Sequence, residues 1–311
     1  MTELQHATSE RHPAARIPPE SPFHPENVEG YREWRDAKLA RFPVSVDALR
    51  VELQDLENPT IAERTALVEH LRRANLAVYH CERPVADRES IARFGEALGL
   101  RRLDEHLCTE EDGISELRVS EGESKGDYIP YTNRPLSWHC DGYYNTPEQT
   151  IRAMLLHCVA EAAEGGENAL LDHELLYIGL RDESPEYISA LMHPETLSIP
   201  ANRKNGREIR PERTGPVFSV DPASGALHMR YTARTRNVRW REDERTRAAV
   251  TRITQLLESD ALPVFRLRLR PGEGIVCNNV LHNRTGFRDD PASGRQRLVY
   301  RGRFFERVAE T

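Results

Sequence analysis

A short histidine–aspartate pair is the clearest chemical feature of this sequence. His139 and Asp141 are two residues apart in the stretch Leu136-Ser-Trp-His-Cys-Asp-Gly-Tyr-Tyr144. In an extended backbone, residues i and i+2 point to the same side, so the imidazole and the carboxylate can converge on one point. A second imidazole would complete a two-histidine, one-carboxylate triad, which binds Fe(II) and leaves positions open for O2 chemistry.

The candidate for the third ligand is His282. A predicted strand at residues 274–277 leads to it through two asparagines, and polar residues follow it. Strand ends at the mouth of a barrel are common places for ligand sites. The alternative is an ordinary surface or hydrogen-bonded histidine. That ordinary role is what we expect for four other histidines of the chain: His157, His173, His193 and His228.

Two arginines four residues apart, Arg297 and Arg301, lie in the last predicted strand at residues 297–305 and therefore point to the same face. A buried guanidinium needs a partner, and its planar shape suits bidentate binding of a carboxylate. Either arginine is thus a candidate anchor for a dicarboxylate. The alternative is a solvated edge strand that exposes four arginines, namely Arg295, Arg297, Arg301 and Arg303.

The composition restricts the class of protein. The chain has 311 residues, 38% hydrophobic and 30% charged, with a formal net charge of −7 and no apolar run long enough to cross a membrane. The acidic balance disfavours nucleic-acid binding. No secretory signal is evident, and the five cysteines show no paired spacing. We therefore expect a cytoplasmic protein with a small-molecule partner and neither a nucleic-acid nor a membrane partner; a homo-oligomer is compatible with this. Cys140 is expected to be a core thiol.

Many short strands and a few helices have to position these residues. Residues 1–25 contain a proline cluster and predict a flexible arm, and residues 26–311 predict a single domain. Helices are expected at residues 28–41, 61–74, 88–98, from 174, at 184–191 and at 242–259. Strands are expected at residues 76–80, 114–119, 150–159, 169–172, 218–220, 227–231, 264–270, 274–277 and 297–305.

This pattern predicts an α+β fold with a central antiparallel core of jelly-roll type, a double-stranded β-helix, and peripheral helices. The first strand, at residues 76–80, is flanked by helices and is expected to pack outside that core. The long polar stretch at residues 120–135, directly before the histidine–aspartate pair, is typical of a lid or substrate loop.

Several motifs together resemble the iron(II)/2-oxoglutarate dioxygenases of the taurine dioxygenase superfamily, and most closely its γ-butyrobetaine and trimethyllysine hydroxylase branch. The resemblance covers residues 67–305. It rests on elements that occur in order: Tyr131-Thr-Asn-Arg-Pro-Leu-Ser-Trp-His-Cys-Asp141, Leu155-Leu-His-Cys158, Gly165-Gly166, Leu171-Asp172, Arg230-Tyr231, Leu281-His-Asn-Arg-Thr-Gly-Phe287, Arg297 and Tyr300. Two features depart from the pattern: Cys140 stands where Thr or Ser is common, and no Cys/His cluster precedes Leu67.

The resemblance implies an Fe(II) site and a 2-oxoglutarate site. The implied metal ligands are His139, Asp141 and His282. Arg297 would bind the distal carboxylate of 2-oxoglutarate, with Asn168 and Arg301 nearby. The implied enzyme is a dioxygenase that uses O2 to hydroxylate an unactivated C–H bond of a small polar molecule, such as an amino acid, amine, betaine or sulfonate. It would release succinate and CO2, and its only catalytic residues would be the metal ligands.

The substrate site is the least defined part of this prediction. Candidate substrate contacts are Tyr143, Tyr144, Asn133 and Tyr231. The two adjacent tyrosines either form an aromatic cage for a quaternary ammonium or pack the barrel mouth. Two alternatives stay open: the same cofactor chemistry used for desaturation or for oxidative C–N or C–S cleavage, and a non-catalytic jelly-roll binding protein.

Overall fold

Two β-sheets form the centre of this protein, which a computed structural model describes for residues 17–83, 87–105, 112–120, 128–204, 206–236 and 238–311. The larger sheet has six strands, in the order β1 (Arg50–Leu53), β2 (Leu76–Cys81), β16 (Glu273–Cys277), β5 (Ala153–Ala160), β19 (Leu298–Phe304) and β3 (Ser115–Leu117). The smaller sheet has four, in the order β15 (Phe265–Leu267), β7 (Asn168–Leu171), β17 (Leu281–Arg284) and β4 (Leu136–His139). Only the β1–β2 pair is parallel among the pairings within these two sheets.

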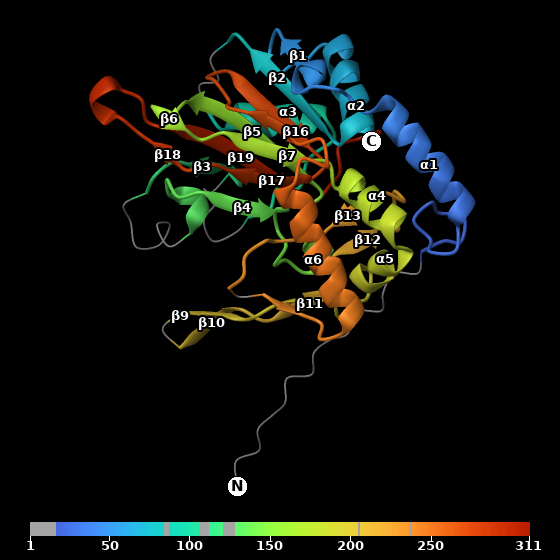
Figure 1. Cartoon of the computed structure of the whole chain (residues 1–311). Helices are drawn as coiled ribbons and strands as arrows, with labels where there is room; N and C mark the ends of the chain where they lie inside the picture. Colours follow the sequence, from blue (N-terminus) through green and yellow to red (C-terminus); the bar gives the residue numbers. More distant parts are fainter. Residues whose placement is uncertain (1–16, 84–86, 106–111, 121–127, 205, 237) are drawn as a thin grey trace.

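The two sheets face each other across a shared apolar core (Figure 1). Leu156, Ile275 and Val299 of the larger sheet pack with Leu170 and Phe265 of the smaller one. Each strand presents alternate side chains to this core, as strands of packed sheets do. The α+β class predicted from the sequence is confirmed, with a core built from two facing sheets.

The position of β2 corrects one prediction. This strand was expected to pack outside the core, but it lies inside the larger sheet between β1 and β16. Its residues are apolar on both faces because one face meets the inter-sheet core and the other meets helices. A strand covered on both faces has a continuous apolar run rather than an alternating one.

Two helices, α2 (Ile61–Ala74) and α3 (Glu89–Ala97), cover the outer face of the larger sheet. Leu67 and Leu71 of α2 and Phe94 of α3 pack there with strand residues. The start of α2 has a full capping box: the Thr60 hydroxyl accepts from the Glu63 amide, and the Glu63 carboxylate accepts from the Thr60 amide. The sequence predicted these bounds for α2.

The first helix, α1 (Val28–Arg41), is fastened to the protein by a buried ion pair. Lys38 lies 2.6 Å from Asp172 and 2.5 Å from Glu174, at the start of α4. The chain before α1 is also packed: Phe23 is 4% exposed, and Arg181 donates to the Pro22 carbonyl. Residues 17–25 of the predicted arm therefore contact the domain, while residues 1–16 lie outside the described ranges.

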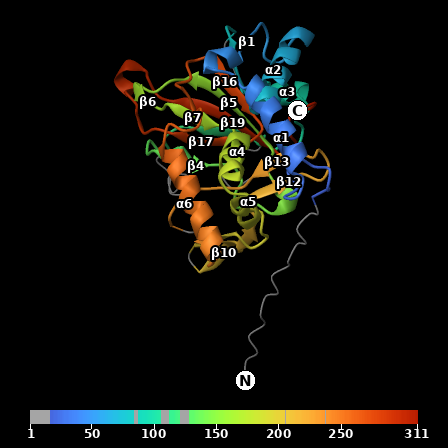
Figure 2. The same cartoon turned by 45° about the vertical axis from the view of Figure 1, so that its right-hand side comes forward.

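Three further helices form a second apolar cluster with short strands (Figure 2). They are α4 (His173–Glu183), α5 (Pro185–Leu191) and α6 (Glu244–Glu258). Each of the three contacts the other two. The apolar side of α6 is the one predicted from its sequence, with Ala249, Ile253, Leu256 and Leu257 buried. Among the described residues, no helix is long and apolar enough to span a bilayer.

The remaining strands are short and lie at the edges of the protein. A three-stranded sheet has the order β11 (Arg213–Gly215), β8 (Leu197–Ile199) and β14 (Arg239–Trp240). Three pairs complete the set: β9 (Asn202–Lys204) with β10 (Arg207–Arg210), β12 (Phe218–Val220) with β13 (Leu227–Met229), and β6 (Glu164–Gly165) with β18 (Phe287–Arg288). The β9–β10 hairpin projects from the body of the protein (Figure 1). The sequence predicted short strands and turns over residues 199–234, which contain β9, β10 and β11, but it gave no bounds for these three strands, whose residues are largely polar.

Candidate metal centre

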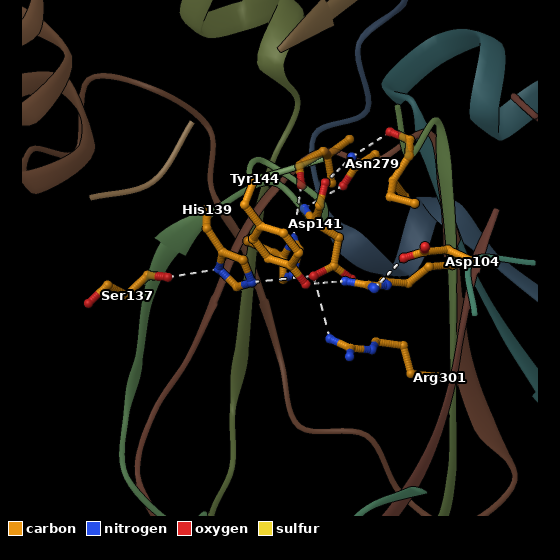
Figure 3. Close-up of polar contacts among 11 residues, drawn as sticks. Asp104, Ser137, His139, Asp141, Tyr144, Asn279 and Arg301 are labelled. Carbon is orange, nitrogen blue, oxygen red and sulfur yellow. Dashed lines mark hydrogen bonds and ion pairs between the residues drawn. The ribbon is translucent and has the colours of Figure 1, made fainter. Parts of the chain in front are cut away.

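Antiparallel pairing of β4 and β17 brings the two candidate histidines together. His139 on β4 is the register partner of His282 on β17, and their ring centroids are 4.2 Å apart. Asp141 follows β4 by two residues, and its Oδ1 lies 3.6 Å from Nε2 of His139. One ligand atom from each of these three buried residues falls within 4.8 Å of the others (Figure 3). The three ligands predicted from the sequence are thus assembled at one point.

Backbone carbonyls orient both imidazole rings. Nδ1 of His139 lies 2.9 Å from the Ser137 carbonyl, and Nδ1 of His282 lies 3.0 Å from the Val280 carbonyl. A carbonyl only accepts, so each Nδ1 carries the proton and donates it. The tautomer follows from this geometry: Nε2 of each ring is left with its lone pair. A carbonyl that fixes the ring and raises its basicity is the usual support of a metal-binding histidine.

The turn that carries Asp141 is held by Asn279, which lies two residues before β17. The Asn279 side-chain oxygen accepts from the Asp141 amide at 2.8 Å, and its amide donates to the carbonyls of Asp141 at 2.9 Å and Ile151 at 2.7 Å. Gly142 follows with φ of 68°, and a Cβ there would lie 2.4 Å from the Ile151 side chain. Glycine is therefore required directly after the carboxylate ligand.

The electrostatics of the three side chains suit a divalent cation. Burial by itself raises the pKa of Asp141, but the positive charge of Arg301, aided by Arg303, outweighs it and holds that pKa well below its usual range. Burial, aided by the neighbouring His139, lowers the pKa of His282 to about 4. The Asp141 carboxylate still has one buried oxygen, Oδ2, without a hydrogen-bond partner. An ionised carboxylate with a free oxygen beside neutral imidazole nitrogens is the donor set of a facial metal triad.

Three arginines, one directly before β19 and two within it, point into the protein rather than into solvent. Arg297, Arg301 and Arg303 are 6%, 6% and 3% exposed, because β19 is an inner strand paired with both β5 and β3. The alternative of an exposed edge strand is wrong for these three arginines. Only Arg295, before the strand, is exposed.

These three arginines have different partners. Nη1 of Arg301 lies 3.4 Å from Oδ1 of Asp141. Arg303 forms an ion pair with Asp104 and donates to the Tyr144 hydroxyl at 2.9 Å. The Arg297 guanidinium donates to the Leu117 carbonyl at 3.3 Å and, among the described residues, has no carboxylate within 4 Å; the Asp289 carboxylate accepts from the Arg297 backbone amide instead. Arg297 is therefore the one of the three whose charge is left for a ligand.

A small cavity lies beside Arg297. Its lining includes Asn168, the Gly165–Gly166 turn and the Arg297 side chain, and its volume of about 10 Å³ is near the minimum for one water molecule. A Cβ on Gly165 would lie 2.3 Å from the Gly286 carbonyl, so this turn needs glycine to approach the chain before β18. Of the three residues predicted at the 2-oxoglutarate site, Asn168 and Arg297 thus line one cavity, and Arg301 does not line it.

The four candidate substrate residues differ in how they lie relative to the metal ligands. Tyr143 stands edge-on to His139 with ring centroids 6.5 Å apart, and Tyr144 stands edge-on to Tyr143 at 5.1 Å. Asn133 is exposed, and its carbonyl accepts from Phe287. The Tyr231 side chain is buried beside Trp240 in the apolar cluster that includes α6, and its backbone carbonyl accepts from the Cys140 amide at 3.0 Å. Of this set, the two adjacent tyrosines thus have ring contacts that reach a metal ligand, whereas Tyr231 contacts the ligand segment through its backbone.

Comparison with known proteins identifies the family to which this chain belongs. The sequence model of the family described as "Taurine catabolism dioxygenase TauD, TfdA family" matches residues 38–302, most of the chain. This protein belongs to the TauD/TfdA family. A uridine-5'-phosphate dioxygenase from Streptomyces sp. is 30% identical over 177 residues, which is 55% of this chain and 62% of that relative. The chain thus spans under two thirds of the length of that relative.

Solved structures show the same fold. An asparagine oxygenase, in complex with Fe(II), 3-hydroxyasparagine and succinate, superposes with a TM-score of 0.56 at 16% identity, over 90% of this chain and 85% of that one. The non-heme iron oxygenase OrfP, in complex with Fe and α-ketoglutaric acid, gives a TM-score of 0.58 at 17% identity, over 79% and 80%. At this identity the likeness concerns the fold of the TauD/TfdA family.

Sequence reasoning missed several residues of this TauD/TfdA site. Asn279 was seen only as part of a polar strand end, and Asp104 was not singled out. Both act through contacts with residues far along the chain, Asn279 with Asp141 and Asp104 with Arg303. The one available signal for Arg303 was its spacing from Arg301, which places both on the same face of a strand. Cys140 is buried, as expected for a core thiol, and the four described cysteines are free; Cys108 lies outside the described residues.

Proposed function

We propose that this protein is an enzyme that uses Fe(II), 2-oxoglutarate and O2 to hydroxylate an unactivated C–H bond of a small polar molecule, with release of succinate and CO2. The observation that carries the proposal is the buried triad His139, Asp141 and His282, with its orphaned carboxylate oxygen. When bound by such a triad, Fe(II) with 2-oxoglutarate supplies the oxidising power for attack on a C–H bond.

Each residue of the triad has an atom that could bind the metal. His139 and His282 would each offer Nε2, and Asp141 would offer Oδ2, the oxygen that has no other partner. Arg301, on the opposite sheet, would stay paired with Oδ1 and keep the carboxylate ionised. A facial triad of this kind would leave positions open on the metal for the cosubstrate and O2.

Arg297 and Asn168 would hold the distal carboxylate of 2-oxoglutarate. Arg297 is buried, its guanidinium forms no ion pair among the described residues, and burial lowers its pKa to about 10. A desolvated guanidinium without a counter-ion is costly, and a carboxylate ligand offsets that cost with paired hydrogen bonds. Arg301 is already committed to Asp141, which supports Arg297 over Arg301 as the main anchor.

The named activities of relatives and structural neighbours support hydroxylation of a small polar molecule. The structural neighbours include an asparagine oxygenase with bound 3-hydroxyasparagine and OrfP with bound 3-hydroxyarginine, and the curated relative acts on uridine 5'-phosphate. The finer assignment to the γ-butyrobetaine and trimethyllysine hydroxylase branch stays a prediction from the sequence, as do the closed jelly-roll core, the single domain at residues 26–311 and the cytoplasmic location.

Two other outcomes share part of this site. Desaturation and oxidative C–N or C–S cleavage use the same triad and cosubstrate, and they differ only in how the substrate is presented. A non-catalytic binding protein would need none of the orienting hydrogen bonds on His139 and His282 and would form no succinate. Those hydrogen bonds, together with the ionised Asp141, favour the enzyme.

The test is succinate formation from 2-oxoglutarate in the presence of Fe(II), screened across amino acids, amines, betaines, sulfonates and nucleotides. His139→Ala and Asp141→Ala are expected to abolish succinate formation and to leave circular dichroism unchanged. His193→Ala is the matched control, because His193 lies in a turn after α5, apart from the triad. Succinate formed at wild-type rates by either triad variant contradicts the proposal.

A further inference from the structure

Three arginines gather beside the tyrosine pair that adjoins the metal ligands. Arg210 ends β10, Arg213 begins β11, and Arg230 follows β13. The Arg210 guanidinium carbon lies 5.8 Å from the centre of the Tyr144 ring. Arg230 donates from Nε to the Tyr143 carbonyl at 2.7 Å and from Nη2 to the Arg213 carbonyl at 3.0 Å. The cluster is thus joined to the two tyrosines by direct contacts.

No carboxylate compensates this positive charge within the described part of the chain. Arg210, Arg213 and Arg230 form no ion pair there. The nearest acidic residue in sequence, Glu212, is engaged by Arg239. Burial and then repulsion from Arg213 lower the pKa of Arg210, and burial and then repulsion from Arg210 lower the pKa of Arg230 to about 10. The three guanidinium groups therefore repel one another while they are partly shielded from water. Such an arrangement is unfavourable unless an anion binds.

The three side chains differ in how many donors they have left. Arg230 is used by the protein: its donors reach four backbone carbonyls, those of Tyr143, Leu197, Gly215 and Arg213. Arg210 gives one bond to the Pro211 carbonyl and one to the Pro200 carbonyl, so most of its five N–H groups remain. Nε of Arg213 is buried without a hydrogen-bond partner in the described residues. Arg230 thus braces the cluster, while Arg210 and Arg213 keep donors for a ligand.

We propose that Arg210 and Arg213 bind a phosphate monoester group of the substrate, and that Tyr143 and Tyr144 lie between this group and the metal ligands. The inference rests on the proposed function, because it names the substrate class of that same site. Three cations call for more than a single negative charge, and a phosphate monoester carries about −1.5 to −2 at neutral pH with three acceptor oxygens. A carboxylate supplies one charge and two oxygens, which leaves the cluster uncompensated.

The order of residues places this group away from the reacting carbon. From the metal ligand His139, the chain of contacts runs through the Tyr143 ring at 6.5 Å, the Tyr144 ring at 5.1 Å and then Arg210 at 5.8 Å. Arg303 fixes the far end of Tyr144 by donating to its hydroxyl and is itself paired with Asp104. The phosphate would therefore act as a handle that orients the substrate, while a C–H bond at its other end faces the metal.

The test is direct binding of phenyl phosphate to the whole protein by isothermal titration calorimetry, without iron or 2-oxoglutarate. Phenol and benzoate serve as neutral and monoanionic comparisons. We expect phenyl phosphate to bind at least tenfold more tightly than either. Arg210→Ala and Arg213→Ala should each weaken phenyl phosphate binding at least tenfold. Arg207→Ala is the matched control, because Arg207 is exposed on the same strand, and it should change binding less than twofold.

A second pair of variants separates loss of the guanidinium group from local unfolding around β10 and β11. Arg210→Lys and Arg213→Lys keep the charge and lose the planar fork, so they should retain more binding than the alanine variants and less than wild type. Equal binding by Arg210→Ala and wild type, equal binding of benzoate and phenyl phosphate, or an equal loss in Arg207→Ala overturns the proposal. Because the titration needs no turnover, it is independent of succinate formation: absence of succinate with every substrate contradicts the proposed function, whereas absence of phosphate binding contradicts only the subsite.

Discussion

Removal of the Asn279 side chain should weaken metal binding without touching a ligand. Asn279 makes three hydrogen bonds to buried backbone groups, two of them to the Asp141 peptide units and one to Ile151. The backbone φ of Asn279 is 50°, in the left-handed region that glycine adopts without strain. Asn279→Gly therefore deletes the hydrogen bonds alone, whereas alanine would add backbone strain.

The magnitude follows from the groups left without partners. Each buried backbone group that loses its partner costs about 1 to 3 kcal/mol. One N–H and two carbonyls lose theirs here, so we expect the free energy of unfolding to fall by about 3 to 5 kcal/mol, allowing for partial relaxation. Loss of a residue that orients a ligand typically lowers metal affinity by about 10- to 100-fold.

The neighbouring Asn278 offers a matched control. It also makes buried hydrogen bonds, but with Asn75, Thr311 and Val308, away from Asp141. Urea denaturation and titration with Co(II), followed by visible absorption, measure stability and metal affinity separately. Asn279→Gly should lower both, while Asn278→Ala should lower stability and leave Co(II) affinity within about twofold of wild type. If Asn279→Gly keeps wild-type Co(II) affinity, or if both variants lose affinity equally, the assigned role of Asn279 is wrong.

Three further predictions test the cosubstrate anchor, the attachment of α1 and the acid limit of stability. Arg297→Ala should raise the 2-oxoglutarate concentration for half-maximal succinate formation by about 10-fold or more, because a charge-assisted pair contributes about 1.5 to 3 kcal/mol. Substitution of the exposed Arg295 by alanine should leave that concentration unchanged. An unchanged concentration in Arg297→Ala would point to Arg301 as the anchor. Lys38→Ala should cost about 3 to 5 kcal/mol in urea denaturation, since it leaves Asp172 buried without its cation; a loss below about 1 kcal/mol would contradict this. Burial lowers the pKa of His157 from 6.5 to about 4, so its contribution to stability is full above pH 6.5 and is lost, by at most about 3 kcal/mol, as pH falls toward 4. His157→Gln should flatten that part of the pH–stability curve, and an unchanged curve would show that His157 does not control it.

Local rules explain why much of the secondary structure was predictable. The bounds of α1 and α2 follow from side chains next to each helix end, such as Thr60 with Glu63 at the start of α2. The candidate ligands were recognisable from their types and from the two-residue spacing of His139 and Asp141. Elements without such local signals were less well predicted. The polar strands β9 and β10 were expected only as unbounded short strands, and they pair with each other. The position of β2 was wrong because its partner β16 lies far along the chain.

By itself the sequence determined which atoms are available for chemistry: two imidazoles, one carboxylate and a series of arginines in the last strand. It did not determine their protonation, burial or partners, because those depend on residues that meet only in the folded chain. The register of β4 with β17 puts His282 opposite His139, and the inner position of β19 buries Arg297, Arg301 and Arg303. Tertiary structure alone decides that Asp141 stays ionised, that Asn279 holds its turn, and that Arg210 and Arg213 meet beside the tyrosines, since each of these effects is a contact between segments far apart in sequence.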